Sequence, residues 1–379
     1  MDINTLISNL KEFDGNGSHS QKERMDLLSA ILNPYNIKFR YKDNIDRIIL
    51  TQSRNQSDFS SPITFQCNGL ILDASNWKVL AMPSNAFNPK ISLKKVANYY
   101  EDNKYKIYPI LDGTIVNLYY YNDKWNLGTT NSYEMNSAKF MGLHTYMEMF
   151  NDVTKQYTNF SLDKLDKKFS YCVGFKHYDM HIFLEKHGEH AWFIQKTNLE
   201  TLTTDTNNET GLPSQDAINL SIKFEELQEE NNRALRSFLR EKQIQYGYIL
   251  RGSFEELKEC SNILLESTLM KRIRQMVYNF PRERDINLNN ENRLDYVILR
   301  GYLNYSNRKI FMDLFPQYQI HYERYKELIN NVVTRIVQCY RNRNIKLKLD
   351  QKIDKLANIF MGYINKTNKL NSFDDKCLS

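Results

Sequence analysis

Two stretches decide the fold of this chain: NGLILDASNWKVLAMPSNAFN at residues 68–88 and YPILDGTIVNLYYYNDKWNLGTTNS at residues 108–132. In both, aromatic and β-branched residues alternate with polar residues, and an Asn-Asp pair interrupts the second stretch. A period of two with turn residues between the runs is typical of antiparallel strands joined by short turns. The two stretches therefore predict a body built on β-sheets.

Helical segments interrupt this strand-like pattern, which extends from about residue 35 to residue 255. The spacing of apolar residues predicts helices over residues 20–32, with Ser20 as the cap, over 136–152 and over 224–242. Residues 202–216 are polar and lack periodicity, so we expect a surface loop there.

The pattern changes near residue 267, after which apolar residues recur at helical spacing. We predict an α+β protein with two domains. Residues 1–267 form antiparallel sheets with flanking helices, and residues 268–379 form an all-α C-terminal domain of three to five helices.

The net charge of +6 over 379 residues is unevenly distributed. Residues 268–379 carry 21 Lys and Arg against 11 Asp and Glu, a net charge of +10, whereas the rest of the chain has a net charge of −4. A hydrophobic fraction of 41% excludes wholesale disorder. The basic character belongs to the predicted helical domain.

The five cysteines are widely separated and include no CxxC pair, which favours reduced thiols in a cytosol-like compartment. The first residues are acidic where a signal peptide would be basic, and no apolar run approaches the length of a bilayer span. We expect a cytoplasmic protein with no membrane partner.

The two opening stretches together resemble the phage-type RNA ligase family of covalent nucleotidyltransferases. In that family an Arg-Gly-led strand reaches a P-F-x-K-F-F-N segment, and a KxDGS motif follows, whose lysine attacks the α-phosphate of ATP. The resemblance covers about residues 35–270. The matching residues are Gly69, Asp73, Pro83, Phe87, Asn88, Asp112, Gly113 and Thr114. It implies a nucleotidyltransferase-like fold for residues 1–267 and a remnant of a nucleotide pocket at Asn88, Asp112, Gly113 and Thr114.

The charged residues that the family uses are absent from the matching positions. Ile110 lies where the family has its nucleophilic lysine, and a side chain without a lone pair cannot form a phosphoramidate. Asn68 replaces the arginine before the glycine, and Asn85 replaces the lysine of the K-F-F-N segment. The family glutamates fall near Gly174 and Tyr246, and no lysine occurs in NILLES at residues 262–267, where the family has a K-x-K strand. We therefore expect no catalytic residue.

Four of the seven histidines, His177, His181, His187 and His190, lie close together in sequence. Imidazole and the nearby thiol of Cys172 suit zinc, but the spacing matches no zinc-finger pattern. We expect exposed strand histidines and no metal.

The C-terminal region interleaves bases with aromatic residues, as in YRNRNIKLK at residues 340–348. Phosphates pair with such bases and nucleobases stack on such rings. The pattern predicts nucleic-acid binding, RNA in particular. The residues predicted to make that contact are Arg341, Arg343, Lys346 and Lys348.

Three functions are compatible with these features. The first is an RNA ligase-like protein that has lost its chemistry, needs no cofactor and binds nucleic acid or a protein. The second is an active ATP-dependent RNA ligase or capping-type nucleotidyltransferase that uses ATP, Mg²⁺ and a displaced lysine. The third is a structural virion protein. The resemblance extends to proteins of large cytoplasmic DNA viruses, which implies the host cytoplasm or the virion as the location.

Overall fold

The computed structural model divides the chain into two units, Met1–Gln275 and Met276–Ser379. It describes residues 1–278 except 16–18, 43–45, 54–55, 89–90, 103, 140–143, 178–188, 216, 218–222, 242–244 and 253–261. Beyond residue 278 it describes only residues 323, 327, 330, 333 and 334, all helical. The predicted all-α domain and the boundary at residue 267 therefore stay predictions.

The first unit contains three sheets, in which every pair of neighbouring strands is antiparallel. The four-stranded sheet has the order β1-β2-β3-β4. Its strands are Lys38–Arg40, Arg47–Thr51, Asn68–Asp73 and Val79–Ala81. The mixed helix and antiparallel-sheet architecture predicted for this part of the chain is confirmed.

The five-stranded sheet has the order β10-β9-β8-β6-β7 and the three-stranded sheet the order β12-β11-β5. The strands of the former are β6 (Thr114–Tyr121), β7 (Lys124–Gly128), β8 (Phe169–Lys176), β9 (His190–Asn198) and β10 (Thr204–Asp205). The strands of the latter are β5 (Tyr105–Pro109), β11 (Gly247–Gly252) and β12 (Asn262–Glu266).

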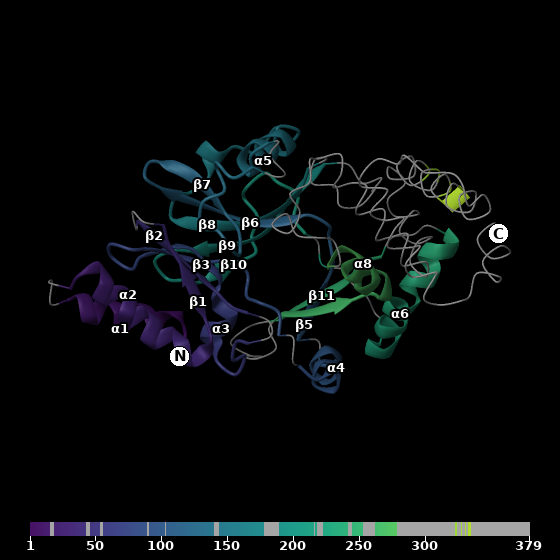
Figure 1. The fold of residues 1–379 in the computed structure, drawn as a ribbon, viewed down its shortest axis with the longest axis horizontal. Coiled ribbons are helices and arrows are strands. Elements are labelled where there is room, and N and C mark those ends of the chain that lie inside the picture. The colour runs from purple at the N-terminus through teal and green to yellow at the C-terminus, as the bar shows by residue number, and fades with distance from the viewer. Residues whose placement is uncertain are drawn as a thin grey trace, which may run out of the picture. The chain divides into compact units, whose positions relative to one another are not determined.

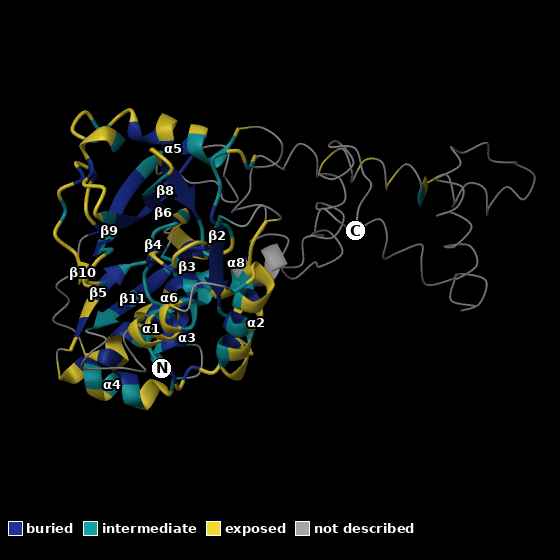
Figure 2. Cartoon of the chain, turned by 90° about the vertical axis from the view of Figure 1, so that its left-hand side faces the viewer, coloured by how far each residue is buried: buried dark blue, intermediate teal, exposed yellow. Residues whose placement is uncertain are grey.

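Strands β2, β3 and β4 of the four-stranded sheet are buried on both faces, which explains their continuous apolar runs (Figure 2). Ile48 and Leu50 pack against α1 (Ile3–Asp14) and α2 (Gln21–Leu32). Ile49 points the opposite way and packs, together with Tyr119 of β6, between the two larger sheets. Figure 1 shows the resulting order of layers.

Helices cover the remaining outer faces. The helix α5 (Tyr146–Thr154) packs on the five-stranded sheet through Met149, Phe150 and Val153. The helices α4 (Leu93–Glu101) and α6 (Phe224–Glu241) cover the three-stranded sheet. Two further helices are α3 (Pro62–Gln66) and α8 (Thr268–Tyr278). None of the helices in the described part of the chain is long and apolar enough to cross a membrane.

The predicted helix over residues 20–32 is confirmed. Ser20 Oγ accepts a hydrogen bond from the backbone N–H of Glu23, and the Glu23 carboxylate accepts one from the backbone N–H of Ser20. This reciprocal capping box fixes where α2 begins. The helix over residues 224–242 is also present, as α6.

The predicted helix over residues 136–152 was wrong in its first part. The carbonyl of Leu127 accepts a hydrogen bond from the N–H of Met135, and the side chain of Asn136 accepts one from the N–H of Leu127. These contacts hold the segment against β7 in a non-helical conformation. The helix begins only at Tyr146, where Thr145 and Glu148 form a second capping box.

The prediction of a surface loop over residues 202–216 was wrong at its C-terminal end. Leu212 is buried in the core between α5 and the five-stranded sheet, and Gln215 is buried beside Phe193 of β9. Polar composition alone could not show this, because the burial depends on contacts with strands distant in sequence.

Candidate functional site

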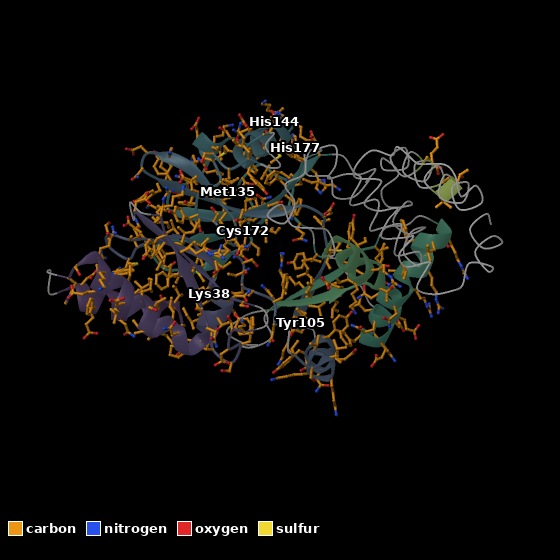
Figure 3. The ribbon with its side chains drawn as sticks, viewed as in Figure 1. Lys38, Tyr105, Met135, His144, Cys172 and His177 are labelled. Carbon is orange, nitrogen blue, oxygen red and sulfur yellow. The ribbon has the colours of Figure 1, made fainter. Side chains whose placement is uncertain are left out.

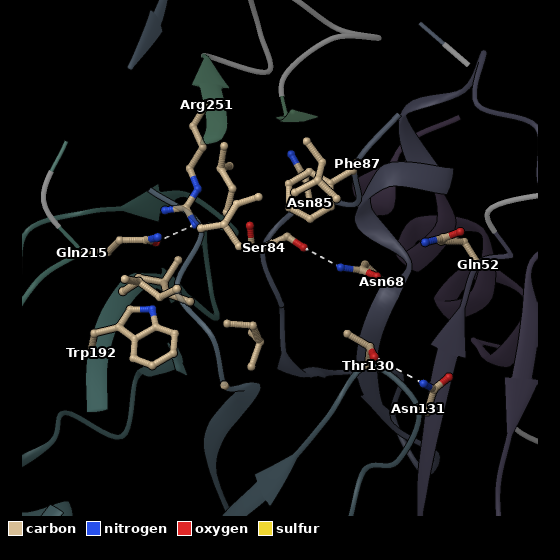
Figure 4. A pocket seen from close by; sticks show the side chains of 17 residues that line it. Gln52, Asn68, Ser84, Asn85, Phe87, Thr130, Asn131, Trp192, Gln215 and Arg251 are labelled. Atoms are coloured by element: carbon tan, nitrogen blue, oxygen red, sulfur yellow. Dashed lines mark hydrogen bonds between the residues drawn. The ribbon is translucent and has the colours of Figure 1, made fainter. Parts of the chain in front are cut away.

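A cavity of about 490 Å³ lies where the three sheets approach one another in the first unit. Figure 4 shows the side chains of the 17 residues that line it. They come from the ends of β2, β3, β5 and β7, from the segment after β4, from the start of β6, from β9, β11 and β12, and from the loop that contains Gln215. The cavity is therefore built from segments far apart in sequence.

Neutral polar side chains form one part of the lining. They are Gln52, Asn68, Ser84, Asn85, Thr130, Asn131 and Gln215. Amides and hydroxyls offer both hydrogen-bond donors and acceptors. They carry no charge.

Apolar side chains form most of the remainder. They are Phe87, Ile110, Leu111, Ile115, Trp192, Ile194, Ile249 and Leu264, and Gly113 and Arg251 complete the lining. Among these described lining residues there is no lysine, histidine or carboxylate, and the single charged side chain is Arg251.

Ile110 lies at the end of β5 and lines the cavity, as the matching position in the family would. Its backbone N–H donates a hydrogen bond to the carbonyl of Gly247, which fixes it beside β11. Gly113 follows with a positive φ of 150°, and a Cβ there would lie 2.6 Å from the carbonyl oxygen of Phe175. Glycine is therefore required in the Asp-Gly turn.

The residues that replace the family cations also line the cavity. Asn68 donates a hydrogen bond of 3.1 Å from Nδ2 to the carbonyl of Ser84. The carbonyl of Asn85 accepts a hydrogen bond of 2.8 Å from Asn262 Nδ2 at the start of β12. Leu264 also lines the cavity and belongs to the segment 262–267, where the resemblance implies a K-x-K strand. The side chains that line the cavity from these three segments are therefore neutral.

Gly174, where the resemblance implies a glutamate, is covered by the indole of Trp192. A Cβ at Gly174 would lie 2.1 Å from two ring carbons of Trp192. Trp192 is 3% exposed, and its Nε1 is buried without a hydrogen-bond partner among the described residues. The space that a carboxylate side chain would need is filled by an aromatic ring.

Asp112 lies beside the cavity but forms an ion pair. Its Oδ2 is 2.9 Å from Nζ of Lys176, whose side chain is 3% exposed. The backbone N–H of Asn88 donates a hydrogen bond to the carbonyl of Asn262 in the three-stranded sheet. Thr114 is the first residue of β6 and pairs with Phe175 of β8. Of the predicted pocket residues, only Gly113 belongs to the lining itself.

Arg251 and Gln215 are two of the lining residues that sequence reasoning missed. Arg251 Nη2 donates a 2.9 Å hydrogen bond to Gln215 Oε1, and the guanidinium lies over the Tyr108 ring at 4.7 Å. Burial lowers the pKa of Arg251 below its ordinary value. The alternation of YGYILRG could have identified Arg251, since residues 249 and 251 share one face of the strand.

The histidine group is only partly described, because His181 and His187 lie outside the described residues. The expectation of an exposed histidine was wrong for His177, which is buried. Its Nε2 lies 3.5 Å from Oε1 of Glu189, and its ring lies edge-on to that of His144 (Figure 3). Within the described ranges, no three His, Cys, Asp or Glu side chains form a group that could hold a metal ion.

The predicted nucleic-acid contacts Arg341, Arg343, Lys346 and Lys348 also lie outside the described residues. Their role stays a prediction.

The resemblance to the RNA ligase family implied antiparallel sheets beside an Asp-Gly turn, and the structure has both. Proteins with similar sequences also point to the class of RNA ligases. A protein of African swine fever virus named "Putative RNA-ligase", from a tick isolate, is 28% identical over 327 residues, which cover 77% of this chain and 72% of the viral protein. The protein of that name from a Vero-adapted strain is 27% identical over 324 residues, covering 76% and 71%. The chain is thus homologous to RNA-ligase-type proteins of a large DNA virus, which confirms the predicted resemblance.

Solved structures with a similar fold include an archaeal ATP-dependent RNA ligase, with 11% identity, a TM-score of 0.37 and coverage of 90% of each chain. An RNA ligase of Naegleria gruberi with pyrophosphate has 13% identity and a TM-score of 0.31, over 50% of this chain and 58% of that chain. Both TM-scores are below 0.5, so the likeness to RNA ligases rests on the sequence relatives. No family model matches the chain.

Proposed function

We propose that this chain is an RNA ligase-like protein that has lost nucleotidyl transfer and binds nucleic acid. The observation that carries the proposal is the composition of the cavity. Its described lining includes Ile110 at the nucleophile position and no lysine, histidine or carboxylate.

Covalent nucleotidyl transfer needs three kinds of group. An amine must attack the α-phosphate, cations must neutralise the triphosphate, and carboxylates must hold Mg²⁺. The described lining supplies one cation, Arg251, and neither an amine nor a carboxylate. Asp112, the carboxylate of the Asp-Gly turn, is paired with Lys176.

Nucleic-acid binding is supported by the name of the viral relatives and by the net charge of +10 on residues 268–379. A basic surface with interleaved aromatic residues suits a single-stranded polyanion. The predicted contacts are Arg341, Arg343, Lys346 and Lys348. A protein partner in place of RNA would be revealed by RNA binding that is absent or independent of salt.

The relatives' name also favours a second candidate, an active RNA ligase that uses a displaced lysine. A candidate for the displaced lysine is Lys176, whose Nζ lies 2.9 Å from Oδ2 of Asp112 in the Asp-Gly turn. Because it is buried in that ion pair, we expect it to be unreactive toward a nucleotide.

Incubation of the full chain with α-³²P-labelled ATP or GTP and Mg²⁺ tests the proposal. We expect no acid-labile lysyl-nucleotide adduct. A stoichiometric adduct, mapped by peptide mass spectrometry to Lys176 or to any other lysine, would overturn the proposal and establish the second candidate.

A further inference from the structure

A short segment with three cations and two aromatic residues forms one edge of the four-stranded sheet. Residues 38–42 read Lys-Phe-Arg-Tyr-Lys, and we call this segment the β1 edge. Its first three residues are β1, which stands first in the strand order of the sheet and pairs, among the described strands, with β2 alone. Figure 3 labels Lys38 on this strand. The β1 edge contains no acidic residue, although residues 1–267 have a net charge of −4.

Two of the cations project from the same face of β1. Lys38 and Arg40 are two residues apart in a strand, so their side chains point to one side and their Cα atoms are roughly 7 Å apart. Both residues are exposed, and neither forms an ion pair with a described residue. Lys42 differs, since its Nζ lies 2.7 Å from Oε2 of Glu134. The β1 edge therefore presents two positive charges that no described carboxylate neutralises.

The aromatic residues of the β1 edge form a stacked pair. Phe39 points to the opposite face of β1, where it is partly buried against the core beneath α1 and α2. The ring of Tyr41 stacks on it, with ring centroids 6.0 Å apart and an interplanar angle of 19°. Tyr41 is nevertheless 46% exposed. Because Phe39 restricts the Tyr41 ring, a planar group that stacks on its exposed side meets a preorganised surface.

Charged residues on an edge strand have an ordinary explanation, because they discourage that edge from pairing with another chain. This explanation accounts for Lys38 and Arg40 but not for the exposed ring of Tyr41, since exposed apolar surface at an edge favours such pairing. Cations interleaved with aromatic rings suit a single-stranded nucleic acid, whose phosphates contact the cations while its unpaired bases stack on the rings. A duplex keeps its bases inside the helix and offers none to Tyr41.

We propose that the β1 edge is a docking surface for single-stranded RNA, in which Lys38 and Arg40 contact phosphates and Tyr41 stacks on a base. This surface belongs to the first unit and is distant in sequence from the predicted contacts at residues 341–348. The inference rests on the proposed function, because it assumes that the chain binds RNA. It adds a second contact region and divides its work between charge and stacking.

The salt dependence of RNA binding tests the two cations. The affinity of the full chain for a short fluorescein-labelled single-stranded RNA is measured by anisotropy over a range of salt concentrations. In the double variant Lys38→Gln/Arg40→Gln, the slope of log K against log salt should fall by about 1.4, at roughly 0.7 per lost phosphate contact. The control Lys78→Gln/Lys94→Gln removes the same charge from exposed positions elsewhere and should leave the slope unchanged. Equal slopes in wild type and the β1 variant would overturn the inference.

Substitutions of Tyr41 test the stacking. Tyr41→Ala should weaken binding of the single strand about 5- to 150-fold and leave the salt slope unchanged, because the ring carries no charge. Tyr41→Phe keeps the ring and should bind the single strand as wild type does. Binding of an RNA duplex of the same length should be the same in all three proteins, since its bases are stacked within the helix. Equal losses in Tyr41→Ala and Tyr41→Phe, or equal losses for single strand and duplex, would contradict stacking.

A footprint on the wild-type chain needs no variant. Bound single-stranded RNA should protect Lys38 from chemical acetylation and leave the reaction of Lys78 unchanged, as quantified by peptide mass spectrometry. Equal acetylation of Lys38 with and without RNA would overturn the inference. A full chain that binds no RNA would defeat the proposed function and this inference together, whereas RNA binding that is the same in wild type and in every β1 variant would defeat only this inference.

Discussion

Ile110 lies where the resemblance implies the nucleophilic lysine, and it is one of several neutral residues that line the cavity. Asn68, Asn85 and Leu264 line the same cavity, and Trp192 covers Gly174. A single reversion would therefore supply an amine without the cations and carboxylates that transfer also needs.

The substitution Ile110→Lys tests this at the level of one residue. We expect no lysyl-adenylate with labelled ATP and Mg²⁺, because the described lining still lacks a carboxylate to hold the metal ion. Wild-type protein is the control. An adduct in Ile110→Lys would show that the nucleophile is the only missing group.

We expect Arg251 to lower the free energy of unfolding of the protein, because its charge is buried. In Arg251→Met the buried charge is removed and the aliphatic length is kept. The free energy of unfolding measured in urea should be equal to or higher than that of wild type by up to about 2 kcal/mol. Arg240→Met is the exposed control and should change it by less than about 0.5 kcal/mol. A clear loss of stability in Arg251→Met would mean that Arg251 has a structural role.

Gly174 is the closest contact of β8 with Trp192. A methyl group there would lie 2.1 Å from the indole, so Gly174→Ala should lower the free energy of unfolding by about 1–3 kcal/mol. Gly15→Ala is the control with a much less severe contact, since its Cβ would lie 3.3 Å from the carbonyl oxygen of Glu12. Equal effects of the two substitutions would contradict the close packing of Trp192 on Gly174.

At the scale of elements, short-range signals predicted the helices well. The Ser20 cap and the Glu23 that follows it are adjacent in sequence, and both partners of the capping box are visible there. The start of α5 could not be predicted, because hydrogen bonds to Leu127 of β7 hold residues 135–136 out of the helix. Gln215 was missed for the same reason, since its burial depends on β9 and on the carbonyl of Pro109.

The contribution of the capping box to the stability of α2 can be tested by substitution. The substitution Ser20→Ala removes the acceptor for the N–H of Glu23 and should lower the free energy of unfolding by about 1 kcal/mol at pH 7. Lys22→Ala, on the exposed face of the same turn, is the control. An equal effect of both substitutions would exclude a capping role.

The same box carries a pH dependence. Hydrogen bonds from Ser20 lower the pKa of Glu23 below its ordinary value, so the folded state favours the ionised carboxylate. This contribution is present above the unfolded pKa and is lost as the pH falls through the lowered folded value. Wild type should therefore lose more stability on acidification below about pH 4.5 than Glu23→Gln, in urea titrations.

At the scale of the whole molecule, the chain separates a sheet-rich unit with a nearly neutral cavity from a basic C-terminal region. The sheet architecture was predictable from alternation, and the absence of the family's charged residues was predictable from the motif positions. Alternation places Ile249 and Arg251 on one face of their strand, but the contacts of Arg251 with Gln215 and Tyr108 were not predictable, because both residues are distant from it in sequence.

Salt dependence of RNA binding tests the role of the C-terminal region. Replacing Arg341, Arg343, Lys346 and Lys348 by Gln in the full chain should weaken binding of a single-stranded RNA. The slope of log K against log salt should fall by about 3, at roughly 0.7 per lost phosphate contact. An unchanged slope would show that these residues make no phosphate contact.

The central claim is that this RNA ligase-like chain forms no covalent bond to a nucleotide, and intact-protein mass spectrometry tests it most directly. The full chain is measured after incubation with ATP or GTP and Mg²⁺. The account predicts a single species at the mass of the unmodified polypeptide. A species heavier by one adenylyl or guanylyl group, in amounts that approach one per chain, would contradict it.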